Sequence, residues 1–362
     1  MENNRQKTEL LELIAVSGEL PADAVYRLGG GRQYKDKLIA SLKNDKLIHV
    51  HYKDKIRGYR LNIKAKRILL NQNHSRFEFF LGENIKSEIT RRLRLHRIAN
   101  ALVTMYNSGA VIFRDDKPDV FNSQNMNKVK TENPCFYTSR EFKEIGKDML
   151  KAKNARAVGI LLTGTETLIV YNTESYEMKW DYNSEKDMKA VISTFLMGRL
   201  GVNRKMNGLL LGNNMEMLLT ALNGKSGKKR GYFFLDNTFD SFIYITNDRY
   251  GETSLKLLYD TEKRTDLDDA LREDLDFKLP DKNNYVENDA MDKNGNPVLF
   301  AYLLDMPRLE RFCKALKPQK RAGTVICFDF QKEVLEKYCG ESIVIDTIDF
   351  AAFEGSFFIE NN

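Results

Sequence analysis

Residues 21–62 contain the pattern that most constrains the fold of this chain. Three consecutive glycines, Gly29 to Gly31, separate two short helical patterns, and two alternating, strand-like segments follow. Glycine adopts positive φ without strain, so the triplet favours a tight turn between the helices. The elements that we expect are, in order, helices over 21–28 and 33–43 and strands over 47–51 and 57–61.

This order of helix, turn, helix and hairpin is typical of a winged helix-turn-helix domain, in which the second helix enters the major groove of DNA. We predict such a domain over residues 1–72. The second helix and the hairpin are rich in side chains that can contact DNA: Arg32, Gln33, Tyr34, Lys35 and Lys37 on the helix, and Lys53, Lys55, Arg57 and Arg60 on the hairpin. Arg and Gln can hydrogen-bond base edges, and cations neutralise phosphates. The pattern therefore predicts binding of double-stranded DNA, although winged helices also serve as protein-interaction modules.

The charge distribution favours the same interpretation. The whole chain of 362 residues has a formal charge of +6. Residues 1–97 contain 21 Lys and Arg against 11 Asp and Glu, whereas the remainder contains 36 against 40. A net charge of +10 at one end and of −4 in the rest indicates a nucleic-acid-binding module joined to a nearly neutral body.

The rest of the chain alternates between helical and strand-like patterns. We predict a multidomain protein of the α+β or α/β class, with a helical segment and a nuclease-like α/β unit over residues 76–200 and a second α/β unit of unknown role over 205–362. The expected strands up to residue 200 are 110–113, 135–137, 155–162, 167–171 and 177–182.

A cluster of arginines lies in the expected helix that follows the first domain. Arg91, Arg92, Arg94 and Arg97 occupy four of seven positions, so they cannot all lie on one side of a helix. Two interpretations stay open: a helix that follows DNA phosphates, and a solvated face above a packed one.

Two acidic motifs raise the alternative of a metal-dependent nuclease. Pro118-Asp119 resembles the first motif of PD-(D/E)xK nucleases, in which carboxylates hold Mg²⁺ or Mn²⁺ and a lysine orients the attacking water. Glu177 and Lys179, on an expected strand, would complete the catalytic set. Glu141-Phe-Lys143 is a weaker partner, because Thr138 and Glu141 have the spacing of a helix capping box. We expect DNA binding rather than catalysis.

The remaining composition points to a cytoplasmic protein. The four cysteines have no zinc-binding spacing, and the four histidines have none with carboxylates, so we expect no bound metal or other cofactor outside the nuclease alternative. From the polar first residues we expect no signal peptide, and we find no apolar segment long enough to span a bilayer. We therefore expect no membrane association.

Several segments together resemble the replication-relaxation family. They are the N-terminal winged-helix pattern, Leu95-His96-Arg97, Lys117-Pro-Asp119 and Ala157 to Leu162. The resemblance covers roughly residues 5–200. It implies a winged helix joined to a restriction-endonuclease-like fold, encoded on plasmids and integrative conjugative elements of gram-positive bacteria.

On this basis we predict a sequence-specific DNA-binding protein that acts in the replication, transfer or regulation of a mobile element. The partners would be duplex DNA and a relaxase or replication initiator, and a homodimer would bind a palindromic site. The alternatives are the nuclease and a protein-interaction scaffold.

Overall fold

The computed structural model describes residues 2–82, 85, 87–122, 128–145, 155–200, 204–224, 231–280 and 286–358. The chain combines helices with sheets, as predicted from the alternating patterns. It divides into two compact units. The first comprises Met1–Met149, Ala157–Thr165 and Ser193–Arg204, and the second comprises Leu150–Arg156, Glu166–Ile192 and Lys205–Asn362.

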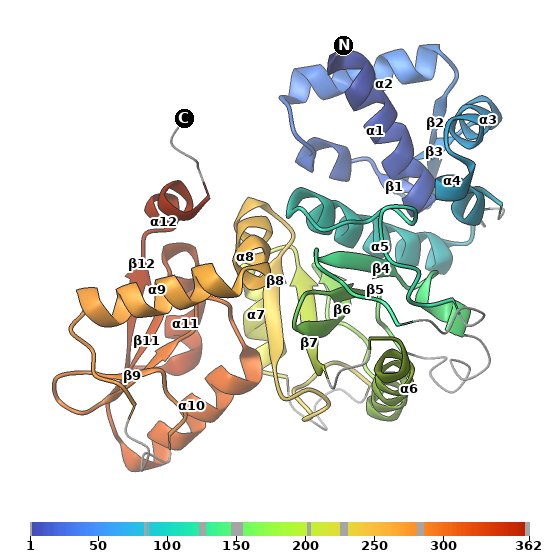
Figure 1. Cartoon of the computed structure of the whole chain (residues 1–362). Helices are drawn as coiled ribbons and strands as arrows, with labels where there is room; N and C mark the ends of the chain where they lie inside the picture. Colours follow the sequence, from blue (N-terminus) through green and yellow to red (C-terminus); the bar gives the residue numbers. More distant parts are fainter. Residues whose placement is uncertain are drawn as a thin grey trace. The chain divides into compact units, whose positions relative to one another are not determined.

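The first unit begins with helices around a small antiparallel sheet (Figure 1). The sheet has the order β1-β3-β2, so the short β1 pairs with the second strand of the β2–β3 hairpin. The elements are α1 (Glu2–Ser17), β1 (Leu20–Pro21), the 3₁₀ helix η1 (Ala24–Arg27), α2 (Arg32–Asn44), β2 (Ile48–Lys53), β3 (Ile56–Leu61) and α3 (Ile63–Gln72).

Most of the expected N-terminal elements are confirmed. The helix expected over 33–43 is α2, and the two expected strands are β2 and β3. Gly30 has a φ of +99°, a conformation that glycine adopts without strain and that fits the tight turn expected at the glycine triplet. The helix expected over 21–28 is wrong in detail, because only the four residues of η1 are helical and β1 ends at Pro21.

Two further helices and a strand pair complete the first unit. Asn73 lies between α3 and the next helix, where its side chain accepts a hydrogen bond from the backbone N–H of Arg76 at 3.1 Å. The expected strand over 110–113 is reduced to a bridge between Val111 and Cys135. The elements are α4 (His74–Leu81), α5 (Ile89–Asn107), β4 (Cys135–Thr138), the 3₁₀ helix η2 (Phe142–Ile145) and β5 (Gly159–Leu162), of which β4 and β5 pair antiparallel.

The second unit contains parallel strands linked by helices. In its first part β7 pairs in parallel with both β6 and β8. The elements here are β6 (Glu166–Glu174), β7 (Lys205–Gly212), α7 (Met215–Leu222), β8 (Phe242–Thr246) and α8 (Arg249–Tyr259); helix α6 (Tyr182–Leu200) has residues in both units. The expected strand over 177–182 is wrong, because in that segment only Lys179 forms a bridge, with Tyr232.

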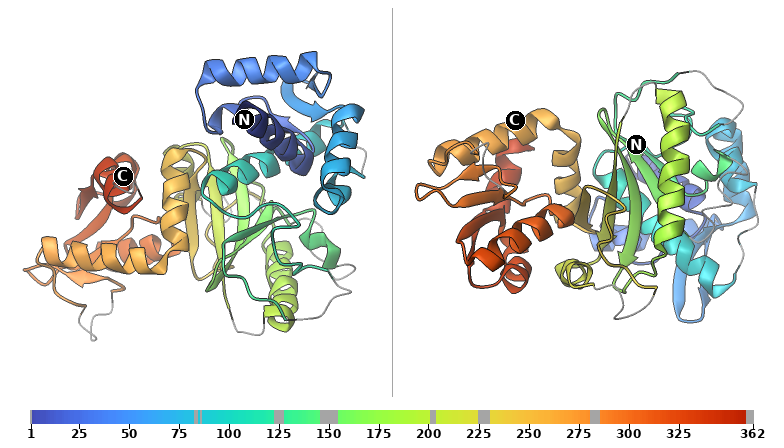
Figure 2. Two further views of the ribbon diagram at one scale, coloured as in Figure 1. Left: turned by 45° about the horizontal axis from the view of Figure 1, so that its top comes forward. Right: turned by 90° about the horizontal axis from the view of Figure 1, so that it is seen from below.

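The last part of the second unit is a four-stranded sheet of order β12-β11-β10-β9. Strands β10, β11 and β12 are parallel, and helices connect them as the alternating pattern predicts. Helices α9 and α10 lie on opposite sides of this sheet (Figure 2). The elements are α9 (Thr261–Asp274), β9 (Ala290–Met291), β10 (Pro297–Phe300), α10 (Met306–Gln319), β11 (Gly323–Phe328), α11 (Lys332–Cys339), β12 (Ile343–Ile348) and α12 (Phe350–Phe357).

An aromatic core forms on the side of this sheet that α9 and α12 cover. Phe300 and Phe328 contribute from the strands, and Phe350 and Phe353 contribute from α12. The rings of Phe328 and Phe353 are 4.9 Å apart, within the range of favourable aromatic contacts. Helix α12 was not expected from the sequence. It packs against the sheet through Phe350 and Phe353, which are buried in this core.

Candidate nucleic-acid interface

Helix α2 presents one apolar and one polar face. Leu38, Ile39 and Leu42 are buried, and they recur at the spacing of one helical face. Arg32, Gln33 and Lys37 are exposed on the other face, where we expected them. Tyr34 is half-buried.

Lys35 is the exception among the basic residues of α2. Its side chain belongs to the inner face of the helix, and only 4% of the residue is exposed. Burial lowers the pKa of Lys35, and the nearby carboxylate of Glu9 opposes that shift. Lys35 therefore does not lie on the exposed basic face on which the sequence pattern placed it.

The first turn of α2 is fixed to the preceding 3₁₀ helix. The guanidinium of Arg32 lies over the ring of Tyr26, 5.1 Å from its centroid. The hydroxyl of Tyr26 donates a hydrogen bond to Asp36 at 2.7 Å. A cation above an aromatic face is attracted by the ring, so Tyr26 restricts the directions that Arg32 can take.

The β2–β3 hairpin closes with a two-residue turn. Lys53 pairs with Ile56, and the residues between them, Asp54 and Lys55, have φ values of +54° and +61°. Positive φ at both central residues is the signature of a type I′ turn, which suits the twist of a hairpin. Lys53, Lys55 and Arg57 are exposed at this end of the hairpin.

Arg60 lies inside the unit rather than on the exposed hairpin surface. It is 8% exposed, and its Nη2 lies 2.6 Å from Oε2 of Glu19. A buried ion pair of this kind occupies the guanidinium, so Arg60 is not available for the phosphate contact that the sequence suggested.

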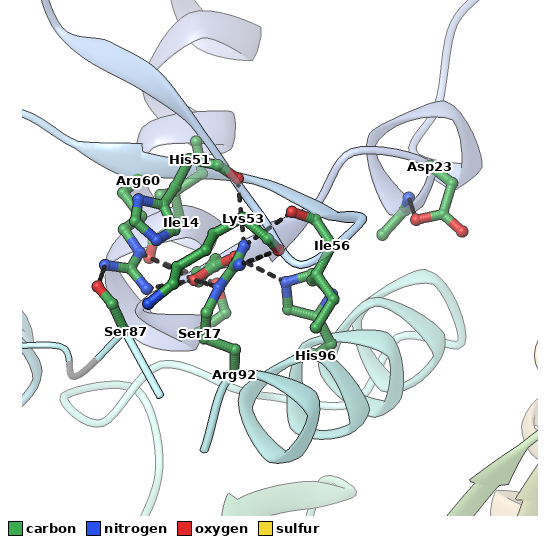
Figure 3. A network of polar contacts seen from close by, with 12 residues as sticks. Ile14, Ser17, Asp23, His51, Lys53, Ile56, Arg60, Ser87, Arg92 and His96 are labelled. Carbon is green, nitrogen blue, oxygen red and sulfur yellow. Dashed lines mark hydrogen bonds and ion pairs between the residues drawn. The ribbon is translucent and has the colours of Figure 1, made fainter. Parts of the chain in front are cut away.

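Glu19 is the centre of a buried polar network (Figure 3). It follows α1, and it binds Arg60 of β3 together with Arg92 and His96 of α5. The Nη2 of Arg92 and the Nε2 of His96 lie 2.6 Å and 2.9 Å from Oε1 of Glu19. Burial on its own would raise the pKa of Glu19, but the hydrogen bonds from His96, Arg92 and Arg60 outweigh it and hold that pKa well below its usual value.

Arg92 connects this network to the end of the hairpin. Its guanidinium donates to the backbone carbonyls of His51 at 3.1 Å, Lys53 at 2.9 Å and Ile56 at 3.1 Å (Figure 3). These carbonyls flank the turn on both sides. Arg92 therefore holds the exposed end of the hairpin against α5.

Gly58 makes room for the carboxylate. A Cβ atom at this position would lie 2.5 Å from Oε1 of Glu19, closer than real Cβ contacts allow. Only glycine lets β3 approach the carboxylate this closely. The glycine in the second strand is thus explained by the network and not by a turn.

The arginine cluster of α5 is divided between the interior and the surface of the unit. Arg92 is fully buried, whereas Arg91 and Arg94 are exposed and Arg97 is half-buried. Arg91 forms an ion pair with Glu88 at 3.2 Å. The cluster therefore combines a structural arginine with exposed ones.

The residues proposed for nuclease chemistry occupy separate local environments. Asp119 is exposed and accepts a hydrogen bond from Asn122 at 2.9 Å, while the backbone carbonyl of Val120 accepts one from the buried Arg199 at 2.9 Å. Glu177 and Lys179 are exposed in the segment between β6 and α6. Among the described residues, no three His, Cys, Asp or Glu side chains come together where they could hold a metal ion.

The alternative acidic partner, Glu141, has a structural role. One of its oxygens accepts hydrogen bonds from the backbone N–H of Thr138 at 2.7 Å and from the Thr138 hydroxyl at 2.9 Å. The other forms a buried ion pair with Lys117 at 2.6 Å. Half of the expected capping box forms, because the Glu141 carboxylate accepts from the Thr138 backbone N–H, and the helix that follows is the short η2.

A polar cavity of about 660 Å³ lies within the second unit. On its wall, Arg308 binds Glu287 at 3.0 Å and Asp289 at 2.5 Å, and Arg311 binds Glu287 at 2.9 Å. The charges along this wall compensate one another within the protein. Sequence reasoning did not anticipate this cavity, because its residues come from segments far apart in the chain.

Sequence reasoning also missed Glu19 and misjudged Arg92. One local signal was present, since Arg92 and His96 are four residues apart and so share a helix face. The other signal was Glu19 itself, an acidic residue that follows an apolar helix. Neither identifies the partner across the fold.

Within the described part of the chain, no helix is both long and apolar enough to cross a membrane. In comparisons with protein-family models, with curated proteins and with solved structures, nothing matches this chain.

Proposed function

We propose that the first part of the chain, over residues 1–72, is a winged-helix module that binds double-stranded DNA. The order α1, β1, η1, α2, β2, β3 and the pairing of β1 with β3 support this assignment. In this arrangement α2 is the recognition helix and the β2–β3 hairpin is the wing.

The observation that carries the proposal is the exposure of cations on both elements. Arg32 and Lys37 are exposed on α2, and Lys53, Lys55 and Arg57 are exposed on the hairpin. Cations on both the helix and the wing match the phosphates on the two sides of a groove.

Each exposed residue has a role in the proposed contact. Arg32 and Gln33 begin the recognition helix, so they would reach base edges, with guanine and adenine as their preferred partners. Lys37, Lys53, Lys55 and Arg57 would neutralise phosphates. Lys35 and Arg60 are left out of the interface because both are buried.

The experiment that tests the proposal is fluorescence anisotropy of the full-length protein with a generic duplex, titrated across salt concentrations without divalent metal. We expect the logarithm of the affinity to fall with the logarithm of the salt concentration, with a slope of several units. Failure of the protein to bind the duplex at low salt would overturn the proposal and favour the protein-interaction scaffold.

Helix α2 offers a matched pair of variants for this experiment. Lys35→Met and Lys37→Met remove the same charge from the same helix, two residues apart, but only Lys37 is exposed. Lys37→Met should weaken binding several-fold and lower the salt slope by roughly 0.9. Lys35→Met should leave both unchanged, and equal losses in the two variants would argue against direct contact by this face.

A role for the whole protein goes with the proposed DNA-binding module. We propose that the protein acts in the replication, transfer or regulation of a mobile element, with a relaxase or replication initiator as partner. If it forms a homodimer, its site on DNA is palindromic.

A further inference from the structure

Two buried cysteines of the second unit lie in contact. Cys313 is on α10 and Cys339 is the last residue of α11, and their sulfur atoms are 3.5 Å apart. They are 2% and 0% exposed. A separation this short needs little further movement to reach the length of a sulfur–sulfur bond, about 2 Å.

The surroundings make the two thiols unequal. The hydrogen bond between the two thiols lowers the pKa of Cys313, burial opposes that shift, and the ammonium of Lys317 lowers the pKa further. The same hydrogen bond and burial raise the pKa of Cys339. Lys317 follows Cys313 by one helical turn, and its ammonium lies 3.5 Å from the backbone carbonyl of Tyr338, next to Cys339. Lys317 is exposed, and its positive charge favours the ionised form of both thiols.

The other two cysteines have different environments. Cys327 is buried on β11, and burial raises the pKa of its thiol to about 12. Cys135 is buried on β4, and its thiol donates to the carbonyl of Asn133 at 3.3 Å. A thiol must ionise to act as a nucleophile, so these environments disfavour reaction at Cys327 most strongly.

We propose that Cys313 and Cys339 form a thiol oxidation site, at which a small peroxide closes a reversible disulfide between α10 and α11. The Cys313 thiolate attacks one oxygen of hydrogen peroxide, the O–O bond breaks, and the hydroxide that leaves takes up a proton to become water. Cys313 is then a sulfenic acid. The Cys339 sulfur attacks the Cys313 sulfur, the S–O bond breaks, and a second water carries away the hydroxyl and the Cys339 proton. Two thiols and one peroxide thus give one disulfide and two waters.

The positions of the two cysteines determine which part of the fold the disulfide would restrain. The disulfide would close a loop that contains β11 and α11, because its ends are 26 positions apart in the chain. A cross-link stabilises a fold chiefly by restricting the unfolded chain. Oxidation should therefore raise the melting temperature of the second unit by several degrees, and a thiol reductant should reverse that rise.

The test uses the full-length protein, reduced and then titrated with hydrogen peroxide. Intact mass should fall by the mass of two hydrogens, and peptide mapping without reduction should recover Cys313 joined to Cys339. Cys313→Ser and Cys339→Ser should each abolish the mass loss, whereas Cys327→Ser, a matched buried control, should keep it.

Three results would overturn the proposal. One is the addition of oxygen atoms to the native protein without loss of two hydrogens. Another is a disulfide that contains Cys135 or Cys327. The third is resistance of all four thiols to peroxide until the protein is denatured. Peptide mapping of the unsubstituted protein decides among these outcomes even if a serine variant fails to fold.

Discussion

Arg92 and Glu19 form an ion pair in which both side chains are fully shielded from solvent, with Nη2 and Oε1 2.6 Å apart. The same guanidinium donates to the carbonyls on both sides of the β2–β3 turn. A charge that is taken out of water must be compensated by nearby partners. Here that compensation also determines where the exposed end of the hairpin lies.

Removing the carboxylate charge from this network should destabilise the hairpin. Glu19→Gln leaves Arg60 and Arg92 buried without a counter-charge, and breaking a buried pair in this way costs about 3–5 kcal/mol. We expect faster hydrogen–deuterium exchange over residues 48–61. Glu88→Gln is the control, because its pair with Arg91 is exposed and worth at most about 1 kcal/mol. Equal exchange in the two variants would show that the network does not hold the hairpin.

The turn of the hairpin allows stability and DNA binding to be separated. Lys55 has a φ of +61°, so Lys55→Gly relieves backbone strain of about 1 kcal/mol and creates the Asp-Gly sequence that type I′ turns favour. We expect a higher melting temperature for this variant. The same change removes a cation from the proposed wing, so the salt slope of DNA binding should fall by roughly 0.9.

Lys46→Gly is the matched control for this variant. Lys46 is also exposed and has a φ of +56°, but it follows the C-terminal end of α2, away from the proposed recognition residues. The substitution should stabilise the fold with little effect on DNA affinity. A loss of affinity as large as that of Lys55→Gly would indicate non-specific attraction by net charge instead of contact at the wing.

A buried carboxyl in the second unit should make stability depend on pH. Burial raises the pKa of Glu185 to about 7, although its oxygens accept hydrogen bonds from the Arg156 backbone at 2.7 Å and the Tyr171 hydroxyl at 2.8 Å. Between the ordinary pKa of 4.5, which the unfolded chain has, and this value, the folded state binds more protons than the unfolded state. The free energy of unfolding therefore falls as pH rises across this window, by up to about 3 kcal/mol.

Thermal unfolding followed by circular dichroism from pH 4.5 to 8 would measure this effect. Glu185→Gln cannot ionise, so its stability relative to the unsubstituted protein should rise as pH increases to about 7 and then level off. Glu216→Gln makes the same change at an exposed carboxylate and should show no such trend. A constant difference between Glu185→Gln and the unsubstituted protein would contradict the raised pKa.

Local patterns accounted for much of the secondary structure. The apolar spacing of α2 and the glycine triplet before it predicted that helix to within a residue at each end. The segment 177–182 alternates as a strand should, yet it forms only the bridge at Lys179, because a strand also needs a partner that the alternation does not supply.

The sequence by itself therefore determined the order of the N-terminal elements and the basic character of the surface that they expose. Only the tertiary structure decided which cations are exposed. Lys35, Arg60 and Arg92 resemble their exposed neighbours in the sequence, but the fold buries all three, and Glu19 compensates two of them. The physical reason is distance along the chain: Arg92 lies 73 positions from Glu19, and no periodicity within a helix or strand encodes a contact over that separation.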